Sequence, residues 1–145
     1  MTDPAQQLAQ AAAAEMYRND RASQALGLQL EEVRPGYARM SMTVRPDMLN
    51  GHAICHGGMI FTLADSTFAF ACNSYNINTV AAGCSIEFMQ PVPSGEQLTA
   101  EATEQMLSGR HGVYDIRISN RAGEVVALFR GKSTQIRGHV VPLAE

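Results

Sequence analysis

Alternating apolar and polar positions along the chain predict an antiparallel sheet. Between residues 37 and 44, apolar side chains take every second position and the polar side chains between them face the other way. Pro35 and Gly36 place a turn between this segment and an earlier strand at 28–34, so the two form a hairpin. Four more strands, each ended by turn residues, are expected at 79–90, 97–106, 111–120 and 125–136.

Helical patterns occupy the beginning and the middle of the chain. Asp3 can cap a helix with Pro4 at its first position, and the Gln- and Ala-rich segment continues it to about residue 17. Residues 18–26 are expected to form a short second helix that ends at Gly27. The run 59–73 has almost no polar face, which predicts a helix covered by protein on most sides.

A hairpin, one buried helix and a series of strands together predict the α+β class, with an antiparallel sheet packed on a single helix. With 145 residues, 46% of them hydrophobic, the chain is expected to be one globular domain over 1–145. It begins with a helical segment at 1–27 and ends with a tail at 138–145 that we expect to be disordered.

The charge pattern argues against a nucleic-acid or membrane partner. A net charge of −3 gives no overall attraction to polyanions, and no Lys or Arg lies between residues 46 and 109. The N-terminus lacks the order of a signal peptide, and the central apolar run is short for a membrane span. Three cysteines cannot all pair, so we expect a reduced, cytoplasmic, soluble protein.

Asp65 is the only formally charged residue from Gly57 to Ile86. Burying an unpaired carboxylate is costly unless it has a use, and such a group suits a general base or a nucleophile. The alternatives are a salt bridge to an arginine of a strand, or an exposed position on the helix.

Gly57 and Gly58 stand immediately before the apolar helix, after His56 and with no N-cap expected. The first N–H groups of a helix have no partner within it, so this point can bind developing negative charge. The alternative is that the two glycines only allow a tight corner between loop and helix.

The loop before the helix holds further polar candidates, and each could also be a turn or capping residue. These residues are Asn50, His52, Cys55 and His56. A Cys–His nucleophile lacks an acidic orienting residue in the loop, and a zinc site lacks a matching cluster elsewhere, so no metal is predicted. Phe61, Phe68, Met48, Met59 and Met89 could line an acyl pocket or could be ordinary core.

Six of the eleven basic residues lie between Arg110 and Arg137. Arg130 and Lys132 share one face of the last strand with Leu128, and a basic, partly apolar strip suits a long ligand with phosphates, such as coenzyme A. The alternative is that they are solvated strand residues.

One helix cannot bring Gly57 and Asp65 to the same carbon atom, because eight residues of helix rise about 12 Å. A base and an oxyanion donor must both lie within about 3 Å of the reacting atoms. Two such helices, related by a two-fold axis and packed antiparallel, would meet this requirement. The sequence therefore predicts a homodimer with two shared sites.

Three short motifs resemble the hotdog-fold acyl-CoA thioesterases, most closely the phenylacetate-degradation subfamily. They are Asn50-Gly51-His52, His56-Gly57-Gly58 and Leu63-Ala64-Asp65. The resemblance extends over nearly the whole chain, including residues 37–44, 86–91, 112–116 and 126–132. It implies a five- or six-stranded antiparallel sheet wrapped around one long helix, in dimers that pair again into homotetramers.

The resemblance also implies roles for single residues. Asp65 would be the catalytic carboxylate, Gly57 the backbone donor to the thioester carbonyl, Asn50 a group that places water, and His56 an assisting group. The expected substrate contacts are Gly58, Ser66, Arg110 and Lys132. Some relatives carry a serine or threonine on the strand after the helix. Here that stretch reads Ala81-Ala82-Gly83, so the role is absent or passes to Ser66.

The function expected from these features is hydrolysis of an aryl- or hydroxyarylacetyl-CoA to free acid and CoA, in phenylacetate catabolism, with no cofactor beyond the CoA of the substrate. Asp65 would activate water, or would attack directly to give an anhydride. The alternatives are a hotdog dehydratase or hydratase of 3-hydroxyacyl thioesters, whose His-led motif with proline is missing here, and a non-catalytic acyl-CoA-binding module, for which Asp65 would be dispensable.

Overall fold

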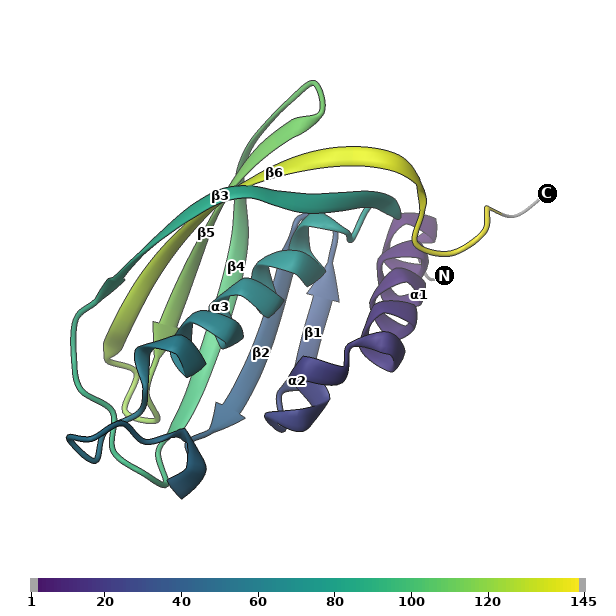
Figure 1. Cartoon of the computed structure of the whole chain (residues 1–145). Helices are drawn as coiled ribbons and strands as arrows, with labels where there is room; N and C mark the ends of the chain where they lie inside the picture. The colour runs from purple at the N-terminus through teal and green to yellow at the C-terminus, as the bar shows by residue number, and fades with distance from the viewer. Residues whose placement is uncertain (1–2, 144–145) are drawn as a thin grey trace.

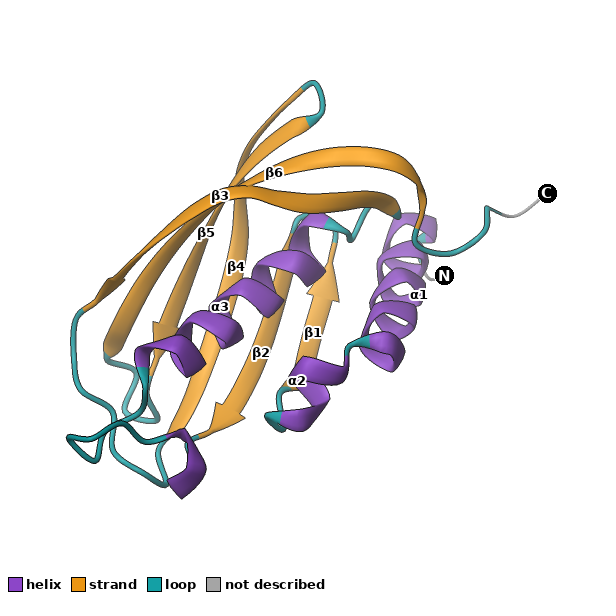
Figure 2. Ribbon diagram, in the orientation of Figure 1, coloured by secondary structure: helices purple, strands orange, loops and turns teal. Residues whose placement is uncertain are grey.

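A six-stranded antiparallel sheet curves around one helix in the computed structural model of the chain, which describes residues 3–143 (Figure 1 and Figure 2). The order along the sheet is β1-β2-β4-β5-β6-β3. The strands are β1 (Gln29–Arg34), β2 (Tyr37–Thr43), β3 (Ile77–Phe88), β4 (Gln97–Ser108), β5 (His111–Ser119) and β6 (Val125–His139). The predicted α+β hotdog architecture is confirmed.

Three α-helices accompany the sheet. They are α1 (Pro4–Asn19), α2 (Arg21–Ala25) and the central α3 (Gly57–Cys72), and a short 3-10 helix, η1, covers Pro46–Met48. Asp3 caps α1 as predicted, accepting a hydrogen bond of 3.0 Å from the Ala5 N–H. Helix α3 begins at Gly57, so both glycines belong to its first turn. Among residues 3–143, no helix is long and apolar enough to cross a membrane.

Residues 138–143 of the tail that the sequence predicts to be disordered over 138–145 belong to the described structure. Strand β6 continues to His139, and Asn76 then holds the backbone of Val141 through both ends of its side-chain amide. Its Nδ2 donates to the Val141 carbonyl at 3.0 Å and its Oδ1 accepts from the Val141 N–H at 2.8 Å. No local pattern signals a pairing between residues so far apart in the chain. Residues 144–145 lie outside the described part.

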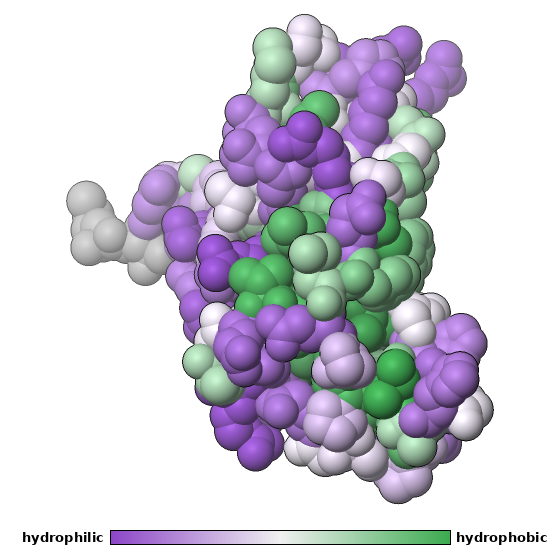
Figure 3. Space-filling view, turned by 90° about the vertical axis from the view of Figure 1, so that its left-hand side faces the viewer, coloured by the Kyte–Doolittle hydropathy of each residue, from purple (hydrophilic) through white to green (hydrophobic). Residues whose placement is uncertain are grey.

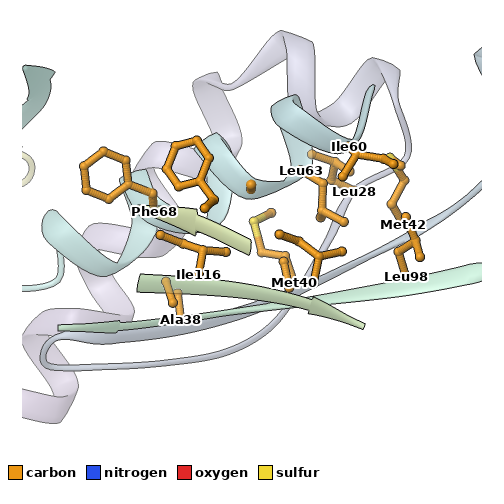
Figure 4. Packing of buried hydrophobic residues seen from close by; sticks show 14 of the residues in the cluster. Leu28, Ala38, Met40, Met42, Ile60, Leu63, Phe68, Leu98 and Ile116 are labelled. Atoms are coloured by element: carbon orange, nitrogen blue, oxygen red, sulfur yellow. The ribbon is translucent and has the colours of Figure 1, made fainter. Parts of the chain in front are cut away.

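The core lies between α3 and the concave face of the sheet (Figure 4). Ile60, Leu63 and Phe68 of α3 point at apolar side chains of β2, β4 and β5, among them Met40, Leu98 and Ile116. Each large side chain buried in this way contributes about 1.5–3 kcal/mol. This packing fixes the rotation of α3, and with it the direction in which its polar residues point.

Strand β3 is an edge of the sheet, bonded on one side only to β6. Its side chains are largely uncovered: Val80 is 46% exposed and Phe88 52%. Residues 77–86 of this strand carry no charge. In Figure 3, hydrophobic residues gather across the middle of the face formed by the left-hand side of Figure 1, where the start of α3 and the end of β3 lie. A long, uncharged, unpaired edge invites a further strand.

Gly131 of β6 lets the Phe68 ring lie directly against the backbone of the sheet. A Cβ on residue 131 would lie 2.6 Å from the Phe68 ring. The ring cannot swing away, because Tyr114 and Phe129 flank it at centroid distances of 5.7 and 5.9 Å.

Gly131→Ala should therefore lower the free energy of unfolding by about 1–3 kcal/mol, the usual cost of overpacking a core. Urea unfolding followed by circular dichroism measures this change. Gly51→Ala is the matched control, because a Cβ there meets nothing within 4 Å. Equal stability of the two variants would show that Phe68 can relax.

Candidate active site

Two backbone hydrogen bonds hold the loop that leads into α3. The Cys55 N–H donates to the Val92 carbonyl at 2.7 Å, and the His56 N–H donates to the Met48 carbonyl at 2.7 Å. The loop is thereby tied to the segment after β3 on one side and to η1 on the other. The start of α3 is consequently a fixed point of the fold.

His56 caps α3, contrary to the expectation that the helix has no N-cap. Its Nδ1 accepts a hydrogen bond of 2.9 Å from the Gly58 N–H, and its carbonyl accepts one of 2.9 Å from the Met59 N–H. Nδ1 must therefore be unprotonated, so in the neutral ring the hydrogen is on Nε2.

The Gly57 N–H is the one backbone donor of this first turn without an acceptor in the described structure. It lies between two donors that are already bonded, at the positive end of the helix dipole. A carbonyl oxygen that becomes negatively charged would find a preformed partner here. The position is the one predicted from the sequence for the oxyanion donor.

Asn50 uses only half of its side-chain amide within the loop. Its Oδ1 accepts hydrogen bonds from the N–H groups of His52 at 2.9 Å and Ile54 at 3.4 Å. The Nδ2 group has no acceptor among the described residues and remains able to donate. Asn50 and Gly57 line the same hollow.

That hollow, of about 400 Å³, opens beside the start of α3 and has no charged residue in its lining. Its apolar walls come from the loop, α3 and the end of β3, and include Ile54, Ile60, Phe88, Met89 and Val92. The Phe88 ring would lie 3.1 Å from a Cβ on residue 57, so only glycine fits there without displacing it.

Few of the residues suggested for an acyl pocket line this hollow. Met89 does, whereas Met48 and Phe68 are 1% exposed and belong to the core. Phe61 packs edge-on against Phe129, with ring centroids 5.4 Å apart, and Met59 packs against the core. Phe88 was not among the residues that the sequence suggested for the pocket. It lies two positions after Ile86, on the same inner face of the strand, and this spacing could have indicated it.

Asp65 lies partly buried in the third turn of α3, with no ion pair and no hydrogen bond to any described residue. The alternative of a salt bridge to an arginine of a strand is therefore wrong within the chain. Burial raises the pKa of the Asp65 carboxyl, and the negative charge of Asp20 raises it further. A carboxylate with a raised pKa is a stronger base, as a proton acceptor requires.

Ser66, the next residue, faces α2. Its hydroxyl lies 2.9 Å from the hydroxyl of Ser23, which is fully buried. The sequence analysis did not associate Ser66 with the N-terminal helices, because two residues 43 positions apart show no local pattern.

Gly57 and Asp65 are not brought together within one chain. Both belong to the same regular helix, so they are separated by a rise of about 12 Å and a rotation of about 80° around the axis. Within a single chain the Gly57 N–H and the Asp65 carboxylate therefore cannot reach the same carbon atom.

Comparison with known proteins identifies the family. The model of the thioesterase superfamily matches residues 52–127. The acyl-coenzyme A thioesterase PaaI of Escherichia coli K12 is 47% identical over 125 residues, covering 86% of this chain and 89% of that protein. The chain belongs to the thioesterase superfamily.

Solved structures of thioesterase relatives agree with the fold. One of them is the structure of the E. coli PaaI protein, from the phenylacetic acid degradation operon. It superposes on this chain with a TM-score of 0.91 at 46% identity, and the match covers 92% of this chain and 97% of that one. A variant of the phenylacetic acid degradation protein PaaI from Thermus thermophilus gives a TM-score of 0.78 at 36% identity, with 81% and 100% covered. The predicted family is confirmed.

The basic residues that the sequence suggested for CoA binding in this thioesterase do not lie beside the start of α3. Arg110 is in the β4–β5 turn, far from the start of α3 (Figure 1). Lys132 is exposed on β6, paired in register with Gly83 and Val113. Arg130 is already bound in two hydrogen bonds, of 2.6 and 2.8 Å, by Asp115. The predicted basic strip therefore has one of its charges neutralised.

Cys55 is unsuited to be a nucleophile of this thioesterase. Burial raises the pKa of its thiol to about 11, so the thiolate is scarce at neutral pH. The described residues contain no group of three or more metal-ligating side chains.

The stability of Asp65→Asn tests whether Asp65 is unpaired in the folded protein. Because burial raises its pKa, the folded state holds the proton more tightly than the unfolded chain, and ionisation at higher pH costs stability. Asp65→Asn should therefore raise the free energy of unfolding at pH 7, and the gain should shrink as the pH falls toward about 4, the usual range of a carboxyl pKa. Urea unfolding at both pH values measures this difference.

Asp115→Asn is the control, and it should change the free energy of unfolding at pH 7 in the opposite direction. Arg130 holds the pKa of Asp115 below its usual value, so this ion pair stabilises at pH 7 and its contribution is lost as the pH falls. Because the pair is largely exposed and screened by solvent, its contribution is small. If both variants lose stability at pH 7, Asp65 has a favourable partner and the assignment is wrong.

Proposed function

We propose that this protein hydrolyses acyl-CoA thioesters to the free acid and CoA, at two equivalent sites shared between the subunits of a homodimer. The observation that carries this proposal is the free Gly57 N–H at the capped start of α3, on the same helix as the unpaired Asp65. These are the two groups that hydrolysis of a thioester needs, one for the developing oxyanion and one for the water.

The dimer follows from the separation of these two groups. If two α3 helices pack antiparallel, the start of each faces the Asp65 of the other. The uncharged edge of β3 supports this arrangement, because pairing with the same strand of a second chain would extend the sheet and cover Val80. The pairing of dimers into a homotetramer and the cytoplasmic location remain predictions.

In the proposed reaction the thioester carbonyl oxygen accepts a hydrogen bond from Gly57 N–H of one subunit. Asp65 of the partner subunit takes a proton from water, whose oxygen attacks the carbonyl carbon. The C–S bond then breaks, and the proton goes to the departing CoA thiolate. The other route is direct attack by Asp65, giving a mixed anhydride that water opens.

Asn50 and His56 have supporting roles in this proposal. The free Nδ2 of Asn50 donates to the attacking water, and the Nε2–H of His56 points a second donor outward from the same turn. Gly58 contributes indirectly, because its N–H holds the His56 ring. Arg110 and Lys132 would bind CoA phosphates. The β4–β5 turn, which carries Arg110, lies far from the start of α3 in Figure 1, and this fits a nucleotide that crosses to the other subunit.

The hollow beside Gly57 is proposed to receive the acyl group. Its size, about 400 Å³, and its uncharged lining with the Phe88 ring suit an uncharged aromatic group of the arylacetyl kind. PaaI of E. coli, the relative at 47% identity, belongs to a phenylacetic acid degradation operon. Both considerations favour aryl- and hydroxyarylacetyl-CoA over long straight chains.

Asp65→Asn should lower kcat for phenylacetyl-CoA by about 10² to 10⁴, because the only base on α3 is removed while its shape is kept. Released CoA is measured with a thiol reagent. Asp47→Asn is the control: this exposed carboxylate near the loop pairs only with Arg45 and should leave kcat unchanged. Near wild-type kcat for a folded Asp65→Asn variant would eliminate Asp65 as the base and would leave a different base.

A further inference from the structure

A chain of three polar side chains joins the N-terminal helices to the middle of α3. Asp20, between α1 and α2, accepts two hydrogen bonds from Ser23: one from its hydroxyl to Oδ2 at 2.6 Å and one from its N–H to Oδ1 at 3.0 Å. The Ser23 hydroxyl also lies 2.9 Å from the hydroxyl of Ser66. Ser66 is the neighbour of Asp65.

The hydroxyl hydrogens of Ser23 and Ser66 can be placed in only one way that satisfies these hydrogen bonds. An ionised carboxylate can only accept, so the single hydroxyl hydrogen of Ser23 must go to Asp20. The hydrogen of the Ser66 hydroxyl must then go to Ser23. Ser66 is therefore not free to donate to a substrate or to water, as expected for a substrate contact, and its role is to attach α3 to α2.

The same carboxylate acts on Asp65 through its charge. Groups that interact with Asp65 lie on three elements: Asp20 on the α1–α2 junction, Cys72 on α3 and Cys84 on β3. None of them is a cation. The negative charge of Asp20 raises the pKa of Asp65 beyond the effect of burial.

We infer that Asp20 is a positioning residue for the hydrolysis: through Ser23 and Ser66 it holds the turn of α3 that carries Asp65, and it places a second negative charge beside that base. This inference rests on the proposed function. It assigns the N-terminal helical segment a part in the reaction that the sequence analysis did not foresee.

The test measures kcat and KM of the 145-residue chain for phenylacetyl-CoA from acidic to mildly alkaline pH. Asp20→Asn removes the charge, so the acid limb of the kcat/KM profile should move to lower pH, and kcat should fall. Ser23→Ala keeps the charge and breaks the link. It should lower kcat by roughly 3- to 30-fold with little change in KM and no shift of the acid limb.

Asp3→Asn is the matched control, because Asp3 caps α1 by the same kind of bond at an exposed site. It should leave the whole pH profile unchanged. If Asp20→Asn does not fold, Ser66→Ala takes its place as the second variant. It leaves the Asp20–Ser23 bonds intact and should reproduce the loss of kcat seen with Ser23→Ala.

A purely structural role would lower thermal stability without moving the acid limb. An Asp20→Asn variant with an unmoved acid limb, or Ser23→Ala and Ser66→Ala variants with wild-type kcat, would overturn the inference. Failure of the proposed function would look different, because either the wild type would not hydrolyse phenylacetyl-CoA or Asp65→Asn would remain active. An inactive Asp65→Asn beside a fully active Asp20→Asn would reject only the role of Asp20.

Discussion

The geometry of a single α-helix governs how this protein can work. The Gly57 N–H, proposed as the oxyanion donor, is at the first residue of α3, and the Asp65 carboxylate is in its third turn, with about 12 Å of helix between them. Packing of α3 against the sheet prevents any rearrangement that would shorten this distance. The uncovered edge of β3 and the partly exposed side of α3 that carries Asp65 are what one half of a two-subunit site should show.

The environment of Asp65 lowers the stability of the fold and makes the Asp65 carboxylate a stronger proton acceptor. Burial and the charge of Asp20 both disfavour the ionised carboxylate, and the described residues provide no cation to relieve the cost. Such a group persists because the surrounding packing holds it: Leu63 and Phe68, on either side in sequence, are buried against the sheet. Destabilised carboxylates of this kind are concentrated at functional sites.

Local patterns predicted the architecture and the free donor at Gly57, because periodicity and glycine positions are local properties of a sequence. The thioesterase family was predicted from the resemblance of three short motifs to known thioesterases. Contacts between distant segments were not foreseen. The His56 cap depends on a ring orientation, the Ser23–Ser66 bond joins α2 to α3, and the Asn76 side chain binds the backbone of Val141. Each arises from tertiary packing. The roles of Asp65, Asn50 and the basic residues rest on chemistry that activity measurements must test.

Mixed dimers of two inactive variants test the shared site most directly. Asp65→Asn removes the base, and Gly57→Pro removes the N–H donor. After co-refolding, one site of each mixed dimer should combine an intact Gly57 with an intact Asp65, while the other carries both defects. Circular dichroism must first confirm that Gly57→Pro folds. The account predicts that activity returns, to about one working site per mixed dimer. Mixed dimers that form without any activity would contradict it.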